Sequence, residues 1–391
     1  MFFQIEKSCP RTGARTGFLH TPHGSLQTPL FMPLATQGSV KALDPSDLKA
    51  IGAAMLLGNA YHLYLRPGPQ VVEKLGGLHR FMKWDGPILT DSGGFQIFSL
   101  GHMCRLNDEG VTFRSHIDGS EHFLTPERAI EIQETLGADI IMALDECAPY
   151  VAPLPALREA MERTHRWAER CLQRHIRKDQ ALFGIVQGGT LPELRRESAK
   201  ALVAMNFPGY AIGGLSVGEP KEQMYAISKE TAALLPPDKP RYLMGVGSPE
   251  DLVECVSHGI DMFDCALPTR TARNGGLLTR QGRINIRNAR FKSANGPVDA
   301  DCDCYTCRTF SAAYVHHLFK CEELLAYRLA TIHNLRFVLR LMEQIRTAIT
   351  GGSFPEFREA FGATYKPTDD EIRTIQKKKW LEGRRSGGNP C

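Results

Sequence analysis

Short apolar runs recur through the first 264 residues, and each is followed by a glycine or a polar residue and then by an amphipathic stretch. Eight of these runs have the length and residue types of buried β-strands. The strands are expected at 30–36, 54–59, 87–91, 139–145, 182–187, 210–214, 241–245 and 260–264. The stretches between them predict helices, of which the clearest cover 126–136, 156–175, 192–205, 220–235 and 249–258. Proline is expected at the first helical position of four of them, at Pro126, Pro192, Pro220 and Pro249.

Alternating strands and helices favour parallel pairing, and eight strand–helix units are the number that closes a barrel. The sequence therefore predicts an α/β protein with a (β/α)8 TIM barrel over residues 1–264. An open, doubly wound sheet is the alternative, but no G-x-G-x-x-G motif opens a helix after the first strand. The stretch 92–125 is too long for a simple loop, and the alternation at 112–118 predicts a β-hairpin insertion after the third strand.

The pattern changes after residue 264. Residues 265–298 contain seven arginines or lysines and no acidic residue, and a long helical stretch follows near 311–350. We expect residues 265–350 to form an Arg-rich insertion and a subdomain packed on the barrel. Residues 351–391 are expected to form a C-terminal helix and tail that complete the barrel surface.

Composition narrows the class of protein. Apolar residues make up 42% and charged residues 23% of the 391 residues, which is typical of a folded chain. The net charge of +4 neither requires nor excludes a nucleic-acid partner. The N-terminus lacks the apolar region of a secretory signal, and the longest apolar stretch, 50–65, is too short and too polar to span a membrane. We therefore expect a cytoplasmic protein whose cysteines serve as thiols or metal ligands rather than in disulfides.

A cluster of cysteines indicates a metal site. Cys302, Cys304 and Cys307 form C-x-C-x-x-C, and His333 follows within a predicted helix. Three thiolates and one imidazole are a usual tetrahedral ligand set of structural zinc, in which protein groups fill all four positions. We expect one structural Zn²⁺ per subunit, within the 265–350 subdomain. Spacing alone leaves alternative fourth ligands, at His316, His317 and Cys321. Iron–sulfur ligation would more often use four cysteines.

Acidic residues follow three of the apolar runs. In a barrel, chemistry takes place at the carboxyl ends of the strands, which here include Asp91, Asp145 and Asp264. A buried carboxylate is costly unless it is hydrogen-bonded or functional. Asp91 alone could cap a helix, but three acids at one mouth favour a catalytic role. Two carboxylates could perform a double displacement at an anomeric carbon, one as nucleophile and the other as proton donor and acceptor.

The neighbouring loops are suited to a flat, guanine-like base. Glycines at 93–94, 188–189 and 213–214 leave room for a ligand to approach the backbone. Asp145 could accept two N–H bonds from one edge of a purine, while Gln187 and Gly214 offer donors for its carbonyl. Phe95 offers a stacking face.

Six segments, followed by the cysteine motif and the distant histidine, resemble the tRNA-guanine transglycosylases, also called queuine tRNA-ribosyltransferases. The segments are DSGGFQIFSL (91–100), ALDEC (143–147), VQGG (186–189), GGLSVGE (213–219), GVGSPED (245–251) and MFDCALPTRTARNG (262–275). The resemblance runs from residue 3 to about residue 365, with the motifs in the family's order. It implies a zinc-containing (β/α)8 barrel that exchanges guanine at the wobble position of GUN-anticodon tRNAs for a 7-deazaguanine base.

The resemblance also implies roles for individual residues. Asp264 corresponds to the nucleophile that attacks C1′ of the wobble ribose, and Asp91 to the general acid/base. The implied base-binding residues are Asp91, Ser92, Gly93, Gly94, Phe95, Asp145, Gln187 and Gly214. The implied contacts to the anticodon loop are Gly245, Val246, Gly247, Ser248, Pro249, Glu250, Asp251, Thr269, Arg270, Thr271, Ala272 and Arg273. The zinc ligands correspond to Cys302, Cys304, Cys307 and His333, and the family forms homodimers.

Two pocket residues bear on the incoming base. Cys147 and Val217 match the residues typical of bacterial members, which insert 7-aminomethyl-7-deazaguanine in queuosine biosynthesis. Their tRNA substrates are those for Asp, Asn, His and Tyr. A queuine-inserting enzyme is the alternative, and a non-catalytic tRNA-binding subunit is a second, although such a subunit would be expected to lose Asp91 and Asp264. A metal-dependent amidohydrolase-type barrel is a third, but the strand ends lack its His-x-His pattern.

Overall fold

The computed structural model describes residues 2–99 and 104–367 and confirms the TIM barrel. One parallel sheet has the strand order β4–β15–β14–β13–β12–β11–β7–β6–β5. Its members are β4 (Leu30–Met32), β5 (Leu34–Ala35), β6 (Leu56–Asn59), β7 (Ile88–Asp91), β11 (Ile140–Met142), β12 (Ala181–Val186), β13 (Gly209–Ile212), β14 (Arg241–Leu243) and β15 (Met262–Asp264). All eight predicted strands are therefore present, and the doubly wound alternative is wrong.

The sheet closes through its first strand, which is broken into two segments at Pro33. The segment before the break, β4, pairs with β15, and the segment after it, β5, pairs with β6. Proline has no N–H to donate to a ladder, but its carbonyl can still accept. The Pro33 carbonyl accepts from the Leu57 N–H at 3.1 Å. The nine strand segments thus make an eight-stranded ring.

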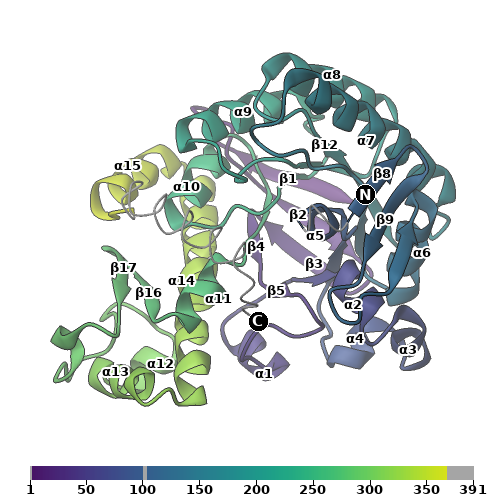
Figure 1. Ribbon diagram of the computed structural model, residues 1–391. Helices are drawn as coiled ribbons and strands as arrows, with labels where there is room; N and C mark the ends of the chain where they lie inside the picture. Colours follow the sequence, from purple (N-terminus) through teal and green to yellow (C-terminus); the bar gives the residue numbers. More distant parts are fainter. Residues whose placement is uncertain (1, 100–103, 368–391) are drawn as a thin grey trace.

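Helices surround the ring, and α6 to α9 curve around its outside (Figure 1). The helices up to the last barrel strand are α1 (Pro45–Ala50), α2 (Ala60–Leu65), α3 (Pro69–Lys74), α4 (Gly77–Met82), α5 (Gly94–Ser99), α6 (Pro126–Leu136), α7 (Leu154–Arg174), α8 (Pro192–Ala204), α9 (Lys221–Leu234) and α10 (Pro249–Ser257). Pro220 differs from the prediction: its backbone is extended, with ψ of 150°, so it is the N-cap of α9 rather than its first residue. Among the described residues, no helix is both long enough and apolar enough to cross a membrane.

The predicted insertion after the third barrel strand has one strand more than a hairpin. β9 (Gly110–Arg114) and β10 (Glu121–Leu124) form the hairpin, and β8 (Cys104–Asn107) pairs antiparallel with β9. The sequence of β8 did not indicate a strand because most of its side chains are exposed, so the segment carries no alternating apolar pattern.

A three-stranded antiparallel sheet at the N-terminus forms the floor of the barrel. It consists of β1 (Phe3–Ser8), β2 (Arg15–Thr21) and β3 (Gly24–Thr28). Phe3, Leu19 and Leu26 join the apolar cluster that fills the barrel interior. We did not expect these strands. β1 and β3 bury too few residues to show a clear two-residue period, and β2 is mostly buried but begins with the polar residues Arg15 and Thr16.

The chain after the last barrel strand forms the long helix α14 and the segments beside it (Figure 1). They comprise α11 (Leu267–Arg273), β16 (Gly276–Thr279), β17 (Gly282–Asn285), a 3-10 turn (Ala289–Phe291), α12 (Tyr305–Thr309), α13 (Ala312–Lys320), α14 (Leu324–Thr350) and α15 (Phe354–Thr364). The single helical stretch expected at 311–350 is two helices, because Glu322 has a left-handed backbone with φ of 56°. α14 packs against α11 to α13 on one side and against β2 and β4 on the other. The expected tail beyond residue 367 lies outside the described residues.

A buried ion pair joins the floor to the barrel. Arg15 opens β2, and its guanidinium donates to both carboxylate oxygens of Asp261, at 2.9 and 2.6 Å. The two side chains are 5% and 0% exposed. Arg15 also donates to the carbonyls of Pro237 and Lys239, and Asp261 accepts from the Arg241 N–H at 2.7 Å. Every charge in the group is therefore hydrogen-bonded.

We predict that Arg15→Ala destabilises the protein strongly. Removing one partner leaves the Asp261 carboxylate buried and unpaired, which costs about 3–5 kcal/mol. Urea unfolding followed by circular dichroism measures the loss. Arg105→Ala is the matched control, because Arg105 pairs with Glu121 on the surface, where both side chains are more than half exposed. Equal midpoints for the two variants would contradict the prediction.

Candidate active site and metal centre

The carboxyl ends of the barrel strands bring the predicted catalytic residues to one mouth. Asp91 is the last residue of β7, and Asp264 is the last residue of β15. Around the closed ring, only β4/β5 and β6 separate these two strands. Burial raises the pKa of Asp91, and the charge of Asp264 raises it further. The structure therefore places both acids together, as expected for a pair that acts on one substrate.

Asp264 is held through one of its two oxygens. Oδ1 accepts from the Tyr242 hydroxyl at 2.5 Å and from the Gly245 N–H at 2.8 Å. Burial raises the pKa of Asp264, while these two hydrogen bonds lower it. Burial and the charge of Asp264 raise the pKa of the Tyr242 phenol well above its ordinary value. The phenol therefore stays protonated and donates a hydrogen bond to Asp264. The carboxylate is thus fixed in orientation and can present Oδ2 to a ligand.

Asp91 has a different environment. Its Oδ2 accepts from the Asn59 amide at 2.6 Å and the Gln96 amide at 3.2 Å, and its Oδ1 accepts from the Ala60 N–H at the start of α2. Burial, and to a smaller extent the charge of Asp264, raises the pKa of Asp91 to about 7. An acid of this pKa can both donate and accept a proton near neutral pH.

Asp145 and Gln187 form a buried polar pair at the same mouth. The Gln187 amide donates to Asp145 Oδ2 at 2.6 Å, and both side chains are buried. Burial raises the pKa of Asp145 to about 6. Gly214 lies against this pair with a φ of +66°, and a Cβ atom there would stand 2.4 Å from Gln187 Oε1. A side chain at residue 214 would therefore displace the amide that the base-binding prediction uses.

The loop after β7 is also tightly placed. A Cβ atom on Gly93 would stand 2.8 Å from Tyr61 Cβ, and one on Gly94 would stand 2.8 Å from the Asp145 carbonyl oxygen. The Ser92 hydroxyl accepts from the Gly94 N–H at 3.3 Å. Phe95, the next residue on α5, is 52% exposed, an unusual degree for phenylalanine. This aromatic face is available to stack on a ligand.

Four residues that the sequence analysis did not assign to the site support these groups. Asn59 and Gln96 bind Asp91, and Tyr242 binds Asp264. Glu219 is buried, and its carboxylate accepts the N–H groups of residues 216, 217 and 218, which fixes the loop after β13. Asn59 ends a predicted strand and Tyr242 is the second residue of another, so strand register was the available signal for both.

The residues expected to contact RNA lie next to Asp264. Within this set Gly245 and Arg270 are exposed, and Ser248, Glu250, Thr271 and Arg273 are partly exposed. Val246 and Asp251 are buried. Asp251 accepts from Tyr225 and pairs with Lys221, so its carboxylate is engaged inside the protein. Arg270 projects from α11, the helix that follows Asp264 directly.

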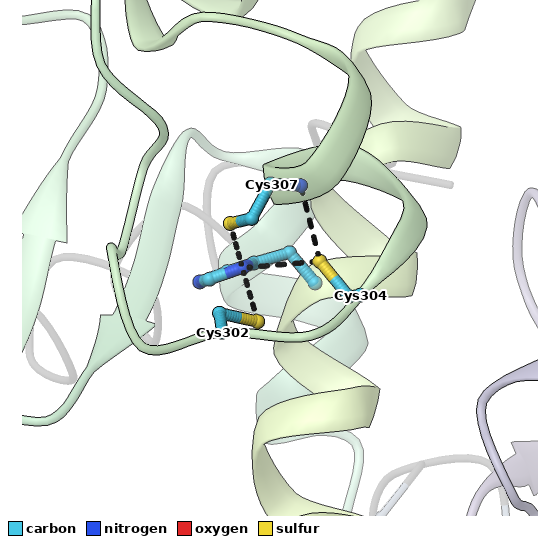
Figure 2. A group of neighbouring side chains, drawn as sticks. Cys302, Cys304 and Cys307 are labelled. Atoms are coloured by element: carbon cyan, nitrogen blue, oxygen red, sulfur yellow. Dashed lines mark hydrogen bonds between the residues drawn. The ribbon is translucent and has the colours of Figure 1, made fainter.

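The four predicted metal ligands converge in the subdomain, where the three thiols point toward one another (Figure 2). The sulfurs of Cys302, Cys304 and Cys307 lie 3.5, 3.6 and 3.3 Å from His333 Nδ1. Zinc–ligand bonds of about 2.3 Å to sulfur and 2.0 Å to nitrogen at tetrahedral angles require a sulfur–nitrogen separation of about 3.5 Å. The residues therefore fit a tetrahedral ion.

The second nitrogen of His333 fixes the ring. Nε2 lies 2.7 Å from the Leu278 carbonyl, so it carries the proton and leaves the Nδ1 lone pair for a metal. The alternative fourth ligands are excluded by their positions. His316 binds the Ile286 carbonyl, and His317 lies beside Cys321 at the surface. This centre lies outside the barrel, so it has no part in chemistry at the mouth.

A metal-dependent hydrolase would need metal ligands at the mouth. In the described part of the chain, two clusters of His, Cys, Asp or Glu have ligand atoms within 4.8 Å of one another. One is the cysteine cluster, and the other contains Asp139, which precedes β11 and thus lies at the opposite end of the barrel. Neither cluster is at the mouth, which argues against the hydrolase alternative.

The sequence matches proteins of known class over nearly its whole length. A family model described as queuine tRNA-ribosyltransferase matches residues 9–367. A protein of that name from Dehalococcoides mccartyi is 57% identical over 382 residues, which are 98% of this chain and 97% of the relative. Two others, from Pelotomaculum thermopropionicum and Geobacillus kaustophilus, are 58% and 56% identical over 93% of this chain and over 98% and 96% of their own length. The chain therefore belongs to the queuine tRNA-ribosyltransferase family, the tRNA-guanine transglycosylases, which are pentosyltransferases.

Proposed function

We propose that this enzyme exchanges guanine at position 34 of GUN-anticodon tRNAs, those for Asp, Asn, His and Tyr, for 7-aminomethyl-7-deazaguanine in queuosine biosynthesis. The observation that carries the proposal is the pair of buried acids, Asp91 and Asp264, at one mouth with different hydrogen-bond partners. Such a pair suits a double displacement that exchanges one N-glycosidic bond for another and needs no ATP or redox cofactor.

In the first displacement, Asp264 attacks C1′ of the wobble ribose. Tyr242 and Gly245 hold Oδ1, which leaves Oδ2 to form the ester bond as the bond to guanine breaks. Asp91, with its pKa raised to about 7, donates a proton to the departing base. The incoming base then gives a proton to Asp91 and attacks C1′, which releases Asp264. Two inversions retain the β configuration.

The base would lie among the groups that surround the Asp145–Gln187 pair. The Asp145 carboxylate accepts the N–H edge of a purine, and the Gln187 amide and the Gly214 N–H donate to its carbonyl. Phe95 stacks on the ring, and Ser92, Gly93 and Gly94 pass close beneath it. Because the wobble base is stacked in the loop, it must be extruded into this pocket, at a cost of a few kcal/mol.

Two features support the choice of substrates. Cys147 and Val217 match bacterial enzymes that use the aminomethyl base, and Val217 N–H is bound to the Glu219 carboxylate at 3.0 Å, which fixes its backbone. Gly245 to Asp251 and Thr269 to Arg273 are proposed to meet the anticodon loop, with Arg270 as an exposed cation on the helix that follows Asp264. By analogy with its family, the enzyme is proposed to act as a cytoplasmic homodimer.

The test of the overall reaction is the loss of radiolabelled guanine from a GUN-anticodon tRNA, chased with 7-aminomethyl-7-deazaguanine or with queuine. Loss of label with the aminomethyl base alone supports the proposal. Loss with queuine alone would keep the mechanism but change the substrate. No loss with either base, from metal-replete protein that binds the tRNA, would favour the non-catalytic tRNA-binding subunit.

The nucleophile is tested with Asp264→Asn. We predict that this variant binds tRNA normally, forms no covalent adduct on a denaturing gel, and exchanges labelled guanine slower by about 10³-fold or more. Asp238→Asn, at an exposed position between α9 and β14, is the control and should exchange at the ordinary rate. An ordinary rate for Asp264→Asn would remove this residue from the chemistry.

The general acid is tested by pH. Asp91 must be protonated to expel guanine, and its pKa of about 7 means that this form is lost as the pH rises through 7. We therefore predict that single-turnover guanine release falls above about pH 7, with a second decline at acidic pH where Asp264 is protonated. Asp91→Ala should slow release by about 10²–10⁴-fold and lose the alkaline decline. A variant with the wild-type rate and profile would contradict the role.

We propose that the ion held by Cys302, Cys304, Cys307 and His333 is one structural Zn²⁺ per subunit. The donor set of three sulfurs and one nitrogen, the separations near 3.5 Å and the burial of His333 support this choice over metals that prefer oxygen. When bound, the ion cross-links the segment 302–307 to α14.

We predict that removing this ion lowers the midpoint of thermal unfolding by at least about 5 °C. Cys302→Ser should lose the zinc, measured by atomic emission, and show the same decrease. Cys321→Ser is the control, because that thiol is exposed and outside the cluster. Zinc-free protein that unfolds at the same temperature as the loaded protein would contradict a structural role.

A further inference from the structure

At the end of the barrel opposite the catalytic mouth, three side chains from distant parts of the sequence converge. His23 lies in the turn between β2 and β3, His79 lies on α4, and Asp139 directly precedes β11. His23 Nδ1 lies 2.8 Å from Asp139 Oδ1, and His79 Nε2 lies 3.0 Å from Asp139 Oδ2. The two imidazole rings are stacked, with centroids 3.5 Å apart and planes 11° from parallel.

These separations are those of neighbouring ligands on one metal ion. Bonds of about 2.1 Å from an ion to nitrogen and oxygen, at right angles to each other, place the two ligand atoms about 3.0 Å apart. The observed nitrogen–oxygen distances are 2.8 and 3.0 Å, and all the ligand atoms lie within 4.8 Å of one another. The lone pair of each imidazole lies in its ring plane, so one of the two nearly parallel rings must turn for both nitrogens to face the same ion. His23 is the more exposed of the two side chains, at 39% against 13%.

We propose that His23, His79 and Asp139 form a second metal site, which binds a divalent first-row transition ion such as Co²⁺, Ni²⁺ or Zn²⁺. Two imidazoles and a carboxylate are a ligand set that such ions prefer, whereas Mg²⁺ and Ca²⁺ prefer oxygen alone. The site differs from the thiolate centre in its donor atoms and in its place in the fold. It leaves coordination positions for water, because His23 is 39% exposed.

The other hydrogen bonds of Asp139 are compatible with a bound ion. Oδ2 also accepts from the Ile88 N–H at 2.8 Å, and Oδ1 accepts from the His23 N–H at 3.3 Å. A carboxylate has two lone-pair positions on each oxygen. One on each oxygen can serve a backbone N–H, which leaves the other for the ion. Binding then replaces the two imidazole–carboxylate hydrogen bonds, and the proton on each of those ring nitrogens moves to the other nitrogen of its ring.

The alternative is that the three residues form a hydrogen-bonded clamp and nothing more. Asp139 is fully buried and has four donors, so it is satisfied without an ion. Both arrangements attach the floor of the barrel to α4 and β11. They differ in one property that can be measured, since only a metal site adds an equivalent of bound ion.

The experiment uses untagged, zinc-replete protein that carries Cys321→Ser, because Cys321 and His317 are an exposed pair that could bind added metal. The protein is equilibrated with Co²⁺ or Ni²⁺ and passed through a desalting column, and bound metals are counted by mass spectrometry. We expect the ratio of metal to chain to rise from one to two. The added Co²⁺ should show weak visible bands without the intense near-ultraviolet absorption of a cobalt–thiolate bond.

His23→Gln and His79→Gln should each return the ratio to one and keep the zinc, and the added metal should no longer raise the unfolding temperature. His23→Gln is the safer variant because its side chain is the more exposed of the two. His20→Gln is the matched control, since His20 is on β2, three residues before His23, and binds Ser25 instead. The proposal would be overturned if the protein with both histidines kept a metal-to-chain ratio of one, or if both glutamine variants reached a ratio of two.

Discussion

Closure of the strand ring is the constraint on which the rest of the molecule depends. If β4 and β5 did not join the ring from its two sides, β7 and β15 would be five strand positions apart in an open sheet. At about 4.8 Å for each position, Asp91 and Asp264 would be about 24 Å apart. The first strand pairs with β15 before Pro33 and with β6 after it, so the ring closes and the two acids lie at one mouth. The closeness of these two acids therefore depends first on the strand topology and only then on side-chain packing.

Closure of the ring also buries the carboxylates of Asp91 and Asp264, and each carboxylate then has its own set of hydrogen-bond partners. Asp264 accepts from a phenol and a backbone N–H through a single oxygen, whereas Asp91 is surrounded by two amides and a helix N-terminus. Burial alone would raise both pKa values, but the interaction between the two charges favours states in which only one acid is ionised. When the two acids hold one proton between them, the ionised carboxylate is suited to nucleophilic attack and the protonated carboxyl to proton transfer.

Much of this arrangement could be predicted from the sequence, because strands buried on both sides are continuous apolar runs and their polar ends stand out. Asp91, Asp145, Asp264 and the four metal ligands were found in this way or through long motifs. β1, β3 and β8 were not, because their mostly exposed residues hide the two-residue period. β2 was not, because this buried strand begins with the polar residues Arg15 and Thr16. Tyr242 was missed for a related reason: an apolar run does not reveal which of its residues points into the barrel, and only the strand register shows this.

The floor also determines when the chain can finish folding. Arg15 finds its partner Asp261 only after 246 further residues have been made, and α14, which packs against β2 and β4, ends at Thr350. Contacts between residues this far apart in the sequence slow folding. During synthesis, the early segments are made before the residues that they pack against. The first strands therefore emerge from the ribosome long before the groups that cover them. Until then, Phe3, Leu19 and Leu26 offer an apolar sheet face of the kind that chaperones bind.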